Sequence, residues 1–171
     1  MEENHSCDCC TAKAKTVPEA AKTNSKSCPA CGQKGRIVDS ATLKAILSVS
    51  LRQIRDNVIY RFCATQDCHV VYYAQDAEQY FTTEQLRVPV YQKADESEDV
   101  PICYCFQYST EQIRQEIQQT GKTSAIDEIN AGIQAGQCAC DWRNPQGNCC
   151  LGNVKQFVTR IQEGENTIAE T

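Results

Sequence analysis

Short runs of β-branched and aromatic residues mark the first half of the chain, whereas the second half repeats its apolar residues at helical spacing. The segments VIYRFC (58–63), HVVYY (69–73) and QLRVPVY (85–91) are rich in Val, Ile, Tyr and Phe, which is typical of short strands. Farther along, Ile113 and Ile117 lie four residues apart, and Ile126, Ile129 and Ile133 recur with the period of a helix. The pattern predicts an α+β fold in which a β-rich unit comes first and a helical unit follows.

The ends of two helices are indicated by their capping residues. Ser109 is placed to cap the first helix with Gln112 at the third helical position, and Gly121 suits a left-handed exit. The second helix is predicted to start at residue 123 or 124 and to stop at Gly136. Two short helices joined by about three residues form an antiparallel hairpin, so the segments that flank them should return to the same place.

Changes in composition divide the chain into five segments. Residues 1–26 are rich in Lys, Ala, Thr, Ser and Glu without apolar periodicity, and we expect a flexible tail there. The stretch KADESEDVP is acidic and poor in apolar residues, as linkers often are. The predicted division is a tail (1–26), a β-rich domain (27–92), a linker (93–101), a helical-hairpin domain (102–153) and a C-terminal extension (154–171).

Cysteine is unusually abundant for a chain with a modest supply of apolar residues. Of 171 residues, 41% are hydrophobic and 13 are Cys. Two small cores with so few apolar residues would need disulfide bonds or metal ions to be stable. The N-terminal sequence MEENHSCDCC has no basic and apolar export segment, which predicts a cytoplasmic protein with reduced thiols. Metal binding is therefore favoured over disulfide bonds.

Charge and motifs exclude several functional classes. The net charge is −5 and no basic cluster occurs, which argues against nucleic-acid binding. No apolar run approaches the roughly 20 residues that cross a bilayer. There is no Ser-His-Asp set, phosphate loop or dinucleotide fingerprint, so we expect no conventional enzyme.

The first thiol constellation combines a CPACG turn with the pair in FCATQDCH. Four thiolates in two close pairs are the ligand set of a closed tetrahedral zinc site, in this chain Cys28, Cys31, Cys63 and Cys68. The spacing of the second pair is wide, and the adjacent His69 is an alternative to Cys68. Neighbouring residues of a strand point to opposite faces, which favours Cys68. A site with four protein ligands leaves no open position, so this zinc is expected to be structural.

The second constellation holds six thiols around the predicted helix pair: Cys103, Cys105, Cys138, Cys140, Cys149 and Cys150. Four thiolates at the mouth of a hairpin suit a [2Fe–2S] cluster. A second zinc site on the same thiols is the main alternative. Pro145 and Gly147 predict a tight turn that aims Cys149 or Cys150 at the metal, with Asn144 and backbone amides as donors to cluster sulfurs.

Two family resemblances bear on these thiols. CYC, a helix pair and a return cysteine are similar to the bacterioferritin-associated ferredoxin family. The order CPAC, YRFCATQDCHVVYY, PICYCF and a cysteine before WRNPQGNCC resembles the N-terminal domain of archaeal CopZ-type copper chaperones over residues 27–152. That resemblance implies a zinc site joined to a [2Fe–2S] cluster. Aligned on Asn144-Pro145-Gln146-Gly147, it implies Cys103, Cys105, Cys140 and Cys150 as cluster ligands, with Cys138 and Cys149 as alternates.

Copper is the cargo that this resemblance suggests. Full-length chaperones of that type continue into a domain with an MxCxxC copper loop, which this sequence lacks. The remaining candidate Cu(I) ligands lie near the N-terminus and comprise His5, Cys7, Cys9 and Cys10. A Cys-rich terminus without a specific role is the alternative interpretation.

The sequence therefore predicts an iron–sulfur and zinc protein that transfers single electrons in the handling of copper or another soft metal. Reduction of Cu(II) by the cluster is the one activity it would have. Expected partners are a soft metal ion and either a copper-transporting ATPase or a redox protein. Two other hypotheses remain: a ferredoxin-like partner of an enzyme without metal cargo, and an interaction module with two zinc sites.

Overall fold

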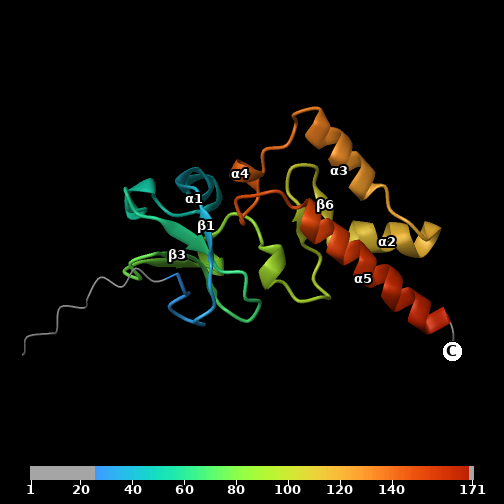
Figure 1. The fold of residues 1–171 in the computed structure, drawn as a ribbon, viewed down its shortest axis with the longest axis horizontal. Coiled ribbons are helices and arrows are strands. Elements are labelled where there is room, and N and C mark those ends of the chain that lie inside the picture. The colour runs from blue at the N-terminus through green and yellow to red at the C-terminus, as the bar shows by residue number, and fades with distance from the viewer. Residues whose placement is uncertain (1–25, 170–171) are drawn as a thin grey trace, which may run out of the picture.

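The computed structural model describes residues 26–169, in which a small sheet is followed by helices (Figure 1). This order confirms the predicted α+β class. The first part contains β1 (Arg36–Val38), α1 (Ser40–Ile46), β2 (Tyr60–Phe62), β3 (Val70–Ala74) and β4 (Tyr80–Thr82). The second part contains β5 (Pro101–Cys103), β6 (Tyr108–Ser109), α2 (Thr110–Thr120), α3 (Ala125–Gln134), α4 (Cys140–Arg143) and α5 (Leu151–Ala169). Short 3-10 turns occur at Leu51–Gln53, Thr83–Gln85 and Tyr91–Lys93.

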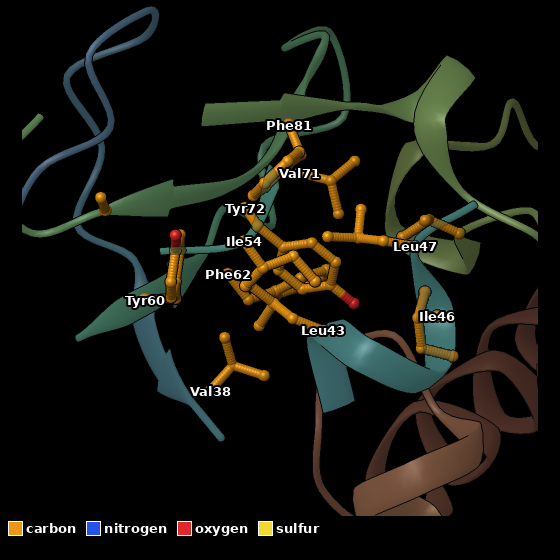
Figure 2. Close-up of a cluster of buried hydrophobic side chains, with 12 residues drawn as sticks. Val38, Leu43, Ile46, Leu47, Ile54, Tyr60, Phe62, Val71, Tyr72 and Phe81 are labelled. Carbon is orange, nitrogen blue, oxygen red and sulfur yellow. The ribbon is translucent and has the colours of Figure 1, made fainter. Parts of the chain in front are cut away.

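The first part is an antiparallel sheet in the order β1-β2-β3-β4. Every residue of β3 is buried, because Tyr73 packs towards the thiols while Tyr72 packs in the apolar core. Figure 2 shows this core, in which Leu43 from α1 and Phe81 from β4 meet the strand side chains. Because side chains alternate along a strand, one face of β3 packs in the apolar core and the other faces the thiols.

Two of the three predicted strands are confirmed and one is wrong. VIYRFC contains β2 and HVVYY contains β3. In QLRVPVY only Leu86 forms an isolated bridge, with Leu47, and the segment ends in a 3-10 turn. Pro89 lies inside that segment and has no amide proton to donate to a ladder, which explains the difference. The fourth strand is instead Tyr80–Thr82.

The predicted helix boundaries are confirmed at α2. The Ser109 hydroxyl accepts a hydrogen bond from the Gln112 amide at 3.2 Å, and the Gln112 side chain accepts one from the Ser109 amide at 2.9 Å. Gly121 ends the helix with a φ of +73°, which favours glycine. The next helix, α3, begins directly after Ser124 and is followed by Gly136 at a φ of +69°.

The C-terminal helix α5 completes the core of the second part, although residues 154–171 were predicted to be an extension. Helices α2 and α3 both pack against α5. Val154, Phe157 and Val158 of α5 are buried in one apolar cluster with Ile113, Ile117 and Ile129. The helix pair is therefore held by a third helix that begins one residue after Cys150.

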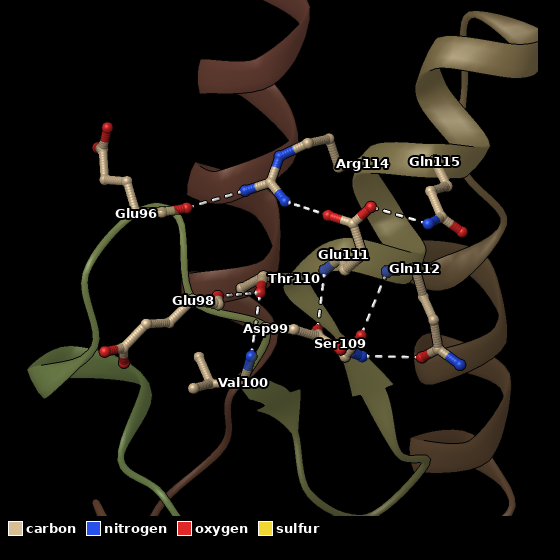
Figure 3. A network of polar contacts seen from close by, with 10 residues as sticks. All are labelled: Glu96, Glu98, Asp99, Val100, Ser109, Thr110, Glu111, Gln112, Arg114 and Gln115. Atoms are coloured by element: carbon tan, nitrogen blue, oxygen red, sulfur yellow. Dashed lines mark hydrogen bonds and ion pairs between the residues drawn. The ribbon is translucent and has the colours of Figure 1, made fainter.

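The acidic segment that was predicted to be a linker is hydrogen-bonded to the start of α2. Figure 3 shows Arg114 donating to the Glu96 carbonyl at 3.0 Å and Thr110 donating to the Glu98 carbonyl at 2.9 Å. The Glu111 amide donates to the Asp99 carboxylate at 3.2 Å, and Arg114 also forms an ion pair with Glu111. These bonds fix the approach of the chain to β5 and to the second group of thiols.

The two parts meet where α1 packs against α4. The Thr42 hydroxyl donates to the Asp141 carbonyl at 2.7 Å, and the Tyr72 hydroxyl donates to the Pro145 carbonyl at 2.6 Å. Gly147 approaches so closely that a Cβ atom there would lie 2.8 Å from Val38. Within residues 26–169, no helix has both the length and the apolar character needed to cross a membrane.

Candidate metal centres

The first group of thiols forms where the turn before β1 meets the loop between β2 and β3. Cys28 and Cys31 lie in a turn closed by two backbone bonds, from the Cys28 amide to the Gln33 carbonyl (2.8 Å) and from the Gly32 amide to the Cys28 carbonyl (2.9 Å). Gly32 has a φ of +73°, which explains the glycine of CPACG. Cys63 directly follows β2 and Cys68 precedes β3, so the sheet holds both loops together.

Distances between the sulfur atoms suit one tetrahedral ion. The Sγ atoms of Cys28 and Cys68 are 3.8 Å apart, and those of Cys31 and Cys63 are 3.6 Å apart. All four Sγ atoms lie within 4.8 Å of one another. An ion with four thiolates at about 2.3 Å separates neighbouring sulfurs by about 3.8 Å. The donor set therefore fits zinc, and it fills all four positions.

His69 does not join this group. Its side chain is exposed, and its ring meets the ring of Tyr80 edge to face with centroids 6.2 Å apart. Cys68 is buried among the other thiols. The alternation along the strand that favoured Cys68 over His69 thus matches the geometry.

Lys93 approaches the first group from the third 3-10 turn and was missed by sequence reasoning. Its ammonium donates to the carbonyls of Thr65 (2.6 Å) and Cys68 (2.9 Å) and lies 3.7 Å from the Cys63 sulfur. Four thiolates around a dication carry a net negative charge, which this ammonium offsets. The sequence placed Lys93 at the start of the linker, and no local motif indicates its role.

The thiols of the first group differ in acidity. Burial raises the pKa of Cys28 to about 12 and also raises the pKa of Cys68. Burial opposes ionisation of Cys31 as well, but hydrogen bonding with the Thr65 side chain and the Gln33 backbone lowers the pKa of Cys31 to about 6. A metal ion that binds here must therefore displace protons from the buried thiols.

The second group of thiols gathers residues from three separate segments. In the first segment, Cys103 ends β5 and Cys105 lies in the turn to β6. In the second, Cys138 and Cys140 follow α3, and in the third, Cys150 immediately precedes α5. Cys103, Cys140 and Cys150 are buried, Cys105 and Cys138 are partly buried, and Cys149 is exposed. The structure thus brings five of the six predicted thiols together and leaves Cys149 at the surface.

These five thiols form a connected series rather than one closed tetrahedron. Cys105 lies 3.6 Å from Cys140 and 3.9 Å from Cys138, and Cys138 lies 3.2 Å from Cys140, measured between Sγ atoms. The Cys150 thiol interacts with the thiols of both Cys103 and Cys140. Among the described residues, only Cys105, Cys138 and Cys140 of this region fall mutually within 4.8 Å.

Mutual hydrogen bonds polarise the second group. The Cys150 thiol lowers the pKa of Cys140 to about 5 and that of Cys103 to about 7. The same bonds, first the one with Cys103, raise the pKa of Cys150. Burial raises the pKa of Cys105 to about 12, although the Ala139 amide donates to its sulfur at 3.3 Å. The site therefore contains thiols ready to ligate as thiolates beside thiols that must lose a proton on metal binding.

The loop of residues 144–147 holds Cys140 and Cys150 in position. The Gly147 amide donates to the Asn144 carbonyl at 2.8 Å, which is the tight turn that Pro145 and Gly147 predicted. Gly147 has a φ of +68°. The Gln146 side chain donates to the Cys149 carbonyl at 3.0 Å and accepts from Gln92 and Asn153.

Asn144, which was expected to donate to cluster sulfurs, forms its hydrogen bonds within its own loop. Its amide nitrogen donates to the Asn148 carbonyl at 2.7 Å, and its oxygen accepts from the Gln146 amide at 3.2 Å. Asn144 is 1% exposed, so both of its polar atoms are committed to the loop. The backbone part of the expectation matches the Ala139 amide, which points at the Cys105 sulfur.

The candidate copper ligands near the N-terminus, His5, Cys7, Cys9 and Cys10, lie outside the described residues. Their proposed role therefore rests on the sequence alone.

Comparisons with known proteins agree with this architecture. Residues 25–87 match the CopZ family model described as a zinc binding domain. No curated protein matches the chain. The X-ray structure of the Archaeoglobus fulgidus CopZ N-terminal domain is similar with a TM-score of 0.64 and 26% sequence identity, over 77% of this chain and 96% of that chain. The structural match therefore extends past the sheet into the helical part, and the chain carries a CopZ-type domain.

Proposed function

We propose that this protein handles soft metals with the help of two resident centres, a structural zinc and a [2Fe–2S] cluster that supplies one-electron transfer. The observation that carries the proposal is the contrast between the two thiol groups. The first closes around a single point, whereas the second is an extended series that runs from Cys103 through Cys150 and Cys140 to Cys105. A tetrahedral ion requires the first arrangement, and a binuclear cluster suits the second.

Zinc would be held by Cys28, Cys31, Cys63 and Cys68. It would supply no reaction, because protein thiolates fill every position. Its contribution is the folding of a sheet whose strands are only three to five residues long. In small domains of this kind, the free energy of metal binding is largely the free energy of folding.

The cluster would be held by Cys103, Cys105, Cys140 and Cys150. These four thiols supply the ligand set of a [2Fe–2S] cluster, and they occur as the adjacent pairs Cys103–Cys150 and Cys105–Cys140. The protein excludes water from Cys103 and Cys150, which are 0% and 1% exposed. The Ala139 amide donates to the Cys105 sulfur and so stabilises negative charge there.

Copper enters the proposal through the CopZ-type domain. Soft thiolate ligands favour Cu(I), and a one-electron centre suits the reduction of Cu(II) with an electron from a redox partner. A copper-transporting ATPase is the partner that would receive such an ion. The thiols of the N-terminal segment, Cys7, Cys9 and Cys10, would serve as its carrier site.

The proposal is tested by anaerobic purification of the full chain, followed by iron, sulfide, zinc and copper analysis with a visible spectrum. We expect equal iron and sulfide at twice the zinc content, and a colour that bleaches with dithionite. Zinc without iron would refute the redox function and favour two zinc sites. A cluster that supports electron transfer while the chain binds no Cu(I) would favour the ferredoxin-like alternative.

Ligand variants test the assignment itself. Cys140→Ser should lose the cluster, whereas Cys149→Ser should retain it, because Cys149 is exposed beside the buried Cys150. Retention of an unaltered cluster in Cys140→Ser would show that the third ligand is misassigned.

A further inference from the structure

The second thiol group contains one sulfur more than a cluster needs. Cys138 lies 3.2 Å from Cys140 and 3.9 Å from Cys105, so it is part of the group by distance. A [2Fe–2S] cluster takes four cysteine ligands. With Cys103, Cys105, Cys140 and Cys150 assigned to the cluster, Cys138 has no role in holding it.

Cys105, Cys138 and Cys140 form a triangle of sulfurs around one point. Three thiolates about 2.3 Å from a common ion lie roughly 4 Å apart. The separations of Cys105 from Cys138 (3.9 Å) and from Cys140 (3.6 Å) are close to that value, and the Cys138–Cys140 separation of 3.2 Å is shorter. The three residues come from the β5–β6 turn and the segment that enters α4. The chain thus presents a three-coordinate set that needs only a shift of less than about 1 Å between the Cys138 and Cys140 sulfurs.

The chemistry of this triangle favours a soft ion of low charge. All three donors are sulfur, and the described residues place no carboxylate or imidazole within the set. Soft thiolates select Cu(I) over harder cations. Cys105 and Cys138 are partly exposed, so an ion can reach the triangle from solvent, whereas Cys103 and Cys150 are buried.

Nearby donors partly offset the negative charge of three thiolates. The Ala139 amide donates to the Cys105 sulfur at 3.3 Å. The Arg143 guanidinium donates to the Cys105 carbonyl at 3.4 Å and places a positive charge beside the triangle. Three thiolates and one monovalent cation carry a net charge of −2, and the Arg143 guanidinium reduces this local charge without a second metal.

We propose that Cys105, Cys138 and Cys140 form a binding site for one Cu(I) ion in the protein that lacks its cluster. Binding releases the thiol protons to solvent and changes no oxidation state. Because Cys105 and Cys140 belong to both sites, the ion and the cluster exclude each other. The inference rests on the proposed function, because a protein that handles soft metals would encounter Cu(I).

The test uses the full chain with zinc bound and the cluster absent, in a background where Cys7, Cys9 and Cys10 are changed to Ser. Cu(I) is added anaerobically against the competing chelator bathocuproine disulfonate. We expect one Cu(I) per chain, X-ray absorption that shows three sulfur neighbours, and an unchanged zinc content. In Cys138→Ser the Cu(I) affinity should fall at least tenfold and the sulfur number should decrease.

Controls separate this site from the cluster. Cys138→Ser should still assemble the cluster, a second variant, Cys138→Ala, should behave in the same way, and Cys149→Ser should retain both Cu(I) binding and the cluster. Unchanged Cu(I) affinity in both Cys138 variants would overturn the inference, as would loss of the cluster from them, since Cys138 would then be a cluster ligand. If the unmodified chain assembles no cluster but Cys138→Ser still weakens Cu(I) binding, the proposed redox function fails and the Cu(I) site stands.

Discussion

The hydroxyl of Tyr72, in the middle of the sheet, donates a 2.6 Å hydrogen bond to the backbone carbonyl of Pro145, in the loop between Cys140 and Cys150. The Tyr72 side chain is fully buried, and burial raises the pKa of its phenol, so it remains a donor throughout the neutral range. One bond thus joins the apolar core of the sheet to the loop between two thiols of the second group.

Replacing Tyr72 with Phe should lower the free energy of unfolding by about 1 to 3 kcal/mol, because the buried Pro145 carbonyl loses its donor. Amide hydrogen exchange should also accelerate in residues 146–150, measured on zinc-loaded protein without a cluster. Tyr80→Phe is the matched control, since Tyr80 is 50% exposed at the far strand and packs on His69. Unchanged exchange in the loop of Tyr72→Phe would show that the bond does not hold it.

A methyl group at Gly147 should separate the two parts of the molecule. Gly147→Ala combines a positive φ with a Cβ atom 2.8 Å from Val38, whereas Gly136→Ala has a similar φ and no neighbour within 4 Å. Both variants should lose about 1 kcal/mol or more from backbone strain. Chemical denaturation should show a larger loss of stability for Gly147→Ala, and equal losses would mean that the contact with Val38 of β1 is easily relaxed.

Lys93 should slow the release of metal from the first thiol group. Lys93→Met removes the ammonium that bridges the Thr65 and Cys68 carbonyls, and hydrogen bonds of charged groups contribute about 1.5 to 3 kcal/mol. Zinc transfer to a chromogenic chelator should therefore become about tenfold faster or more. Lys155→Met changes an exposed lysine of α5 and should leave the rate unaltered. Equal rates of zinc transfer in the two variants would show that Lys93 does not stabilise the bound metal.

The choice between two neighbouring ligands can be tested by substitution. Cys68→Ser should reduce the zinc content and unfold the sheet, because a four-thiolate site supplies much of the folding free energy of a small domain. His69→Ala should keep its zinc and its circular dichroism spectrum. The opposite pattern would make His69 the ligand.

Local patterns predicted the parts of this fold that are decided locally. The capping box of Ser109 and Gln112 and the turn glycine of CPACG depend on residues a few positions apart, so the sequence contained the full signal. The sequence also indicates helix α5, because Leu151, Val154, Val158 and Ile161 recur at helical spacing, although no helix was predicted there.

Contacts between distant residues were not accessible in the same way. Tyr72 and Pro145 are 73 positions apart, and nothing near either residue indicates the other. The role of Lys93 and the commitment of Asn144 to its own loop follow from how the two parts pack. The spacing of the cysteines predicted which thiols are candidate ligands. Only tertiary packing decides that Cys138 lies inside the second group and Cys149 outside it.

The contact between α1 and α4 has a consequence for the biosynthesis of the protein. All four thiols of the first group, together with α1 and Tyr72, precede Cys103 in the chain, so a ribosome completes them before the second group exists. The surface that receives α4 and the loop after it is therefore available when those residues emerge. Closure of the first thiol group during translation would prepare the molecule for the second, so a chain that cannot close the first group should also fail to assemble the second.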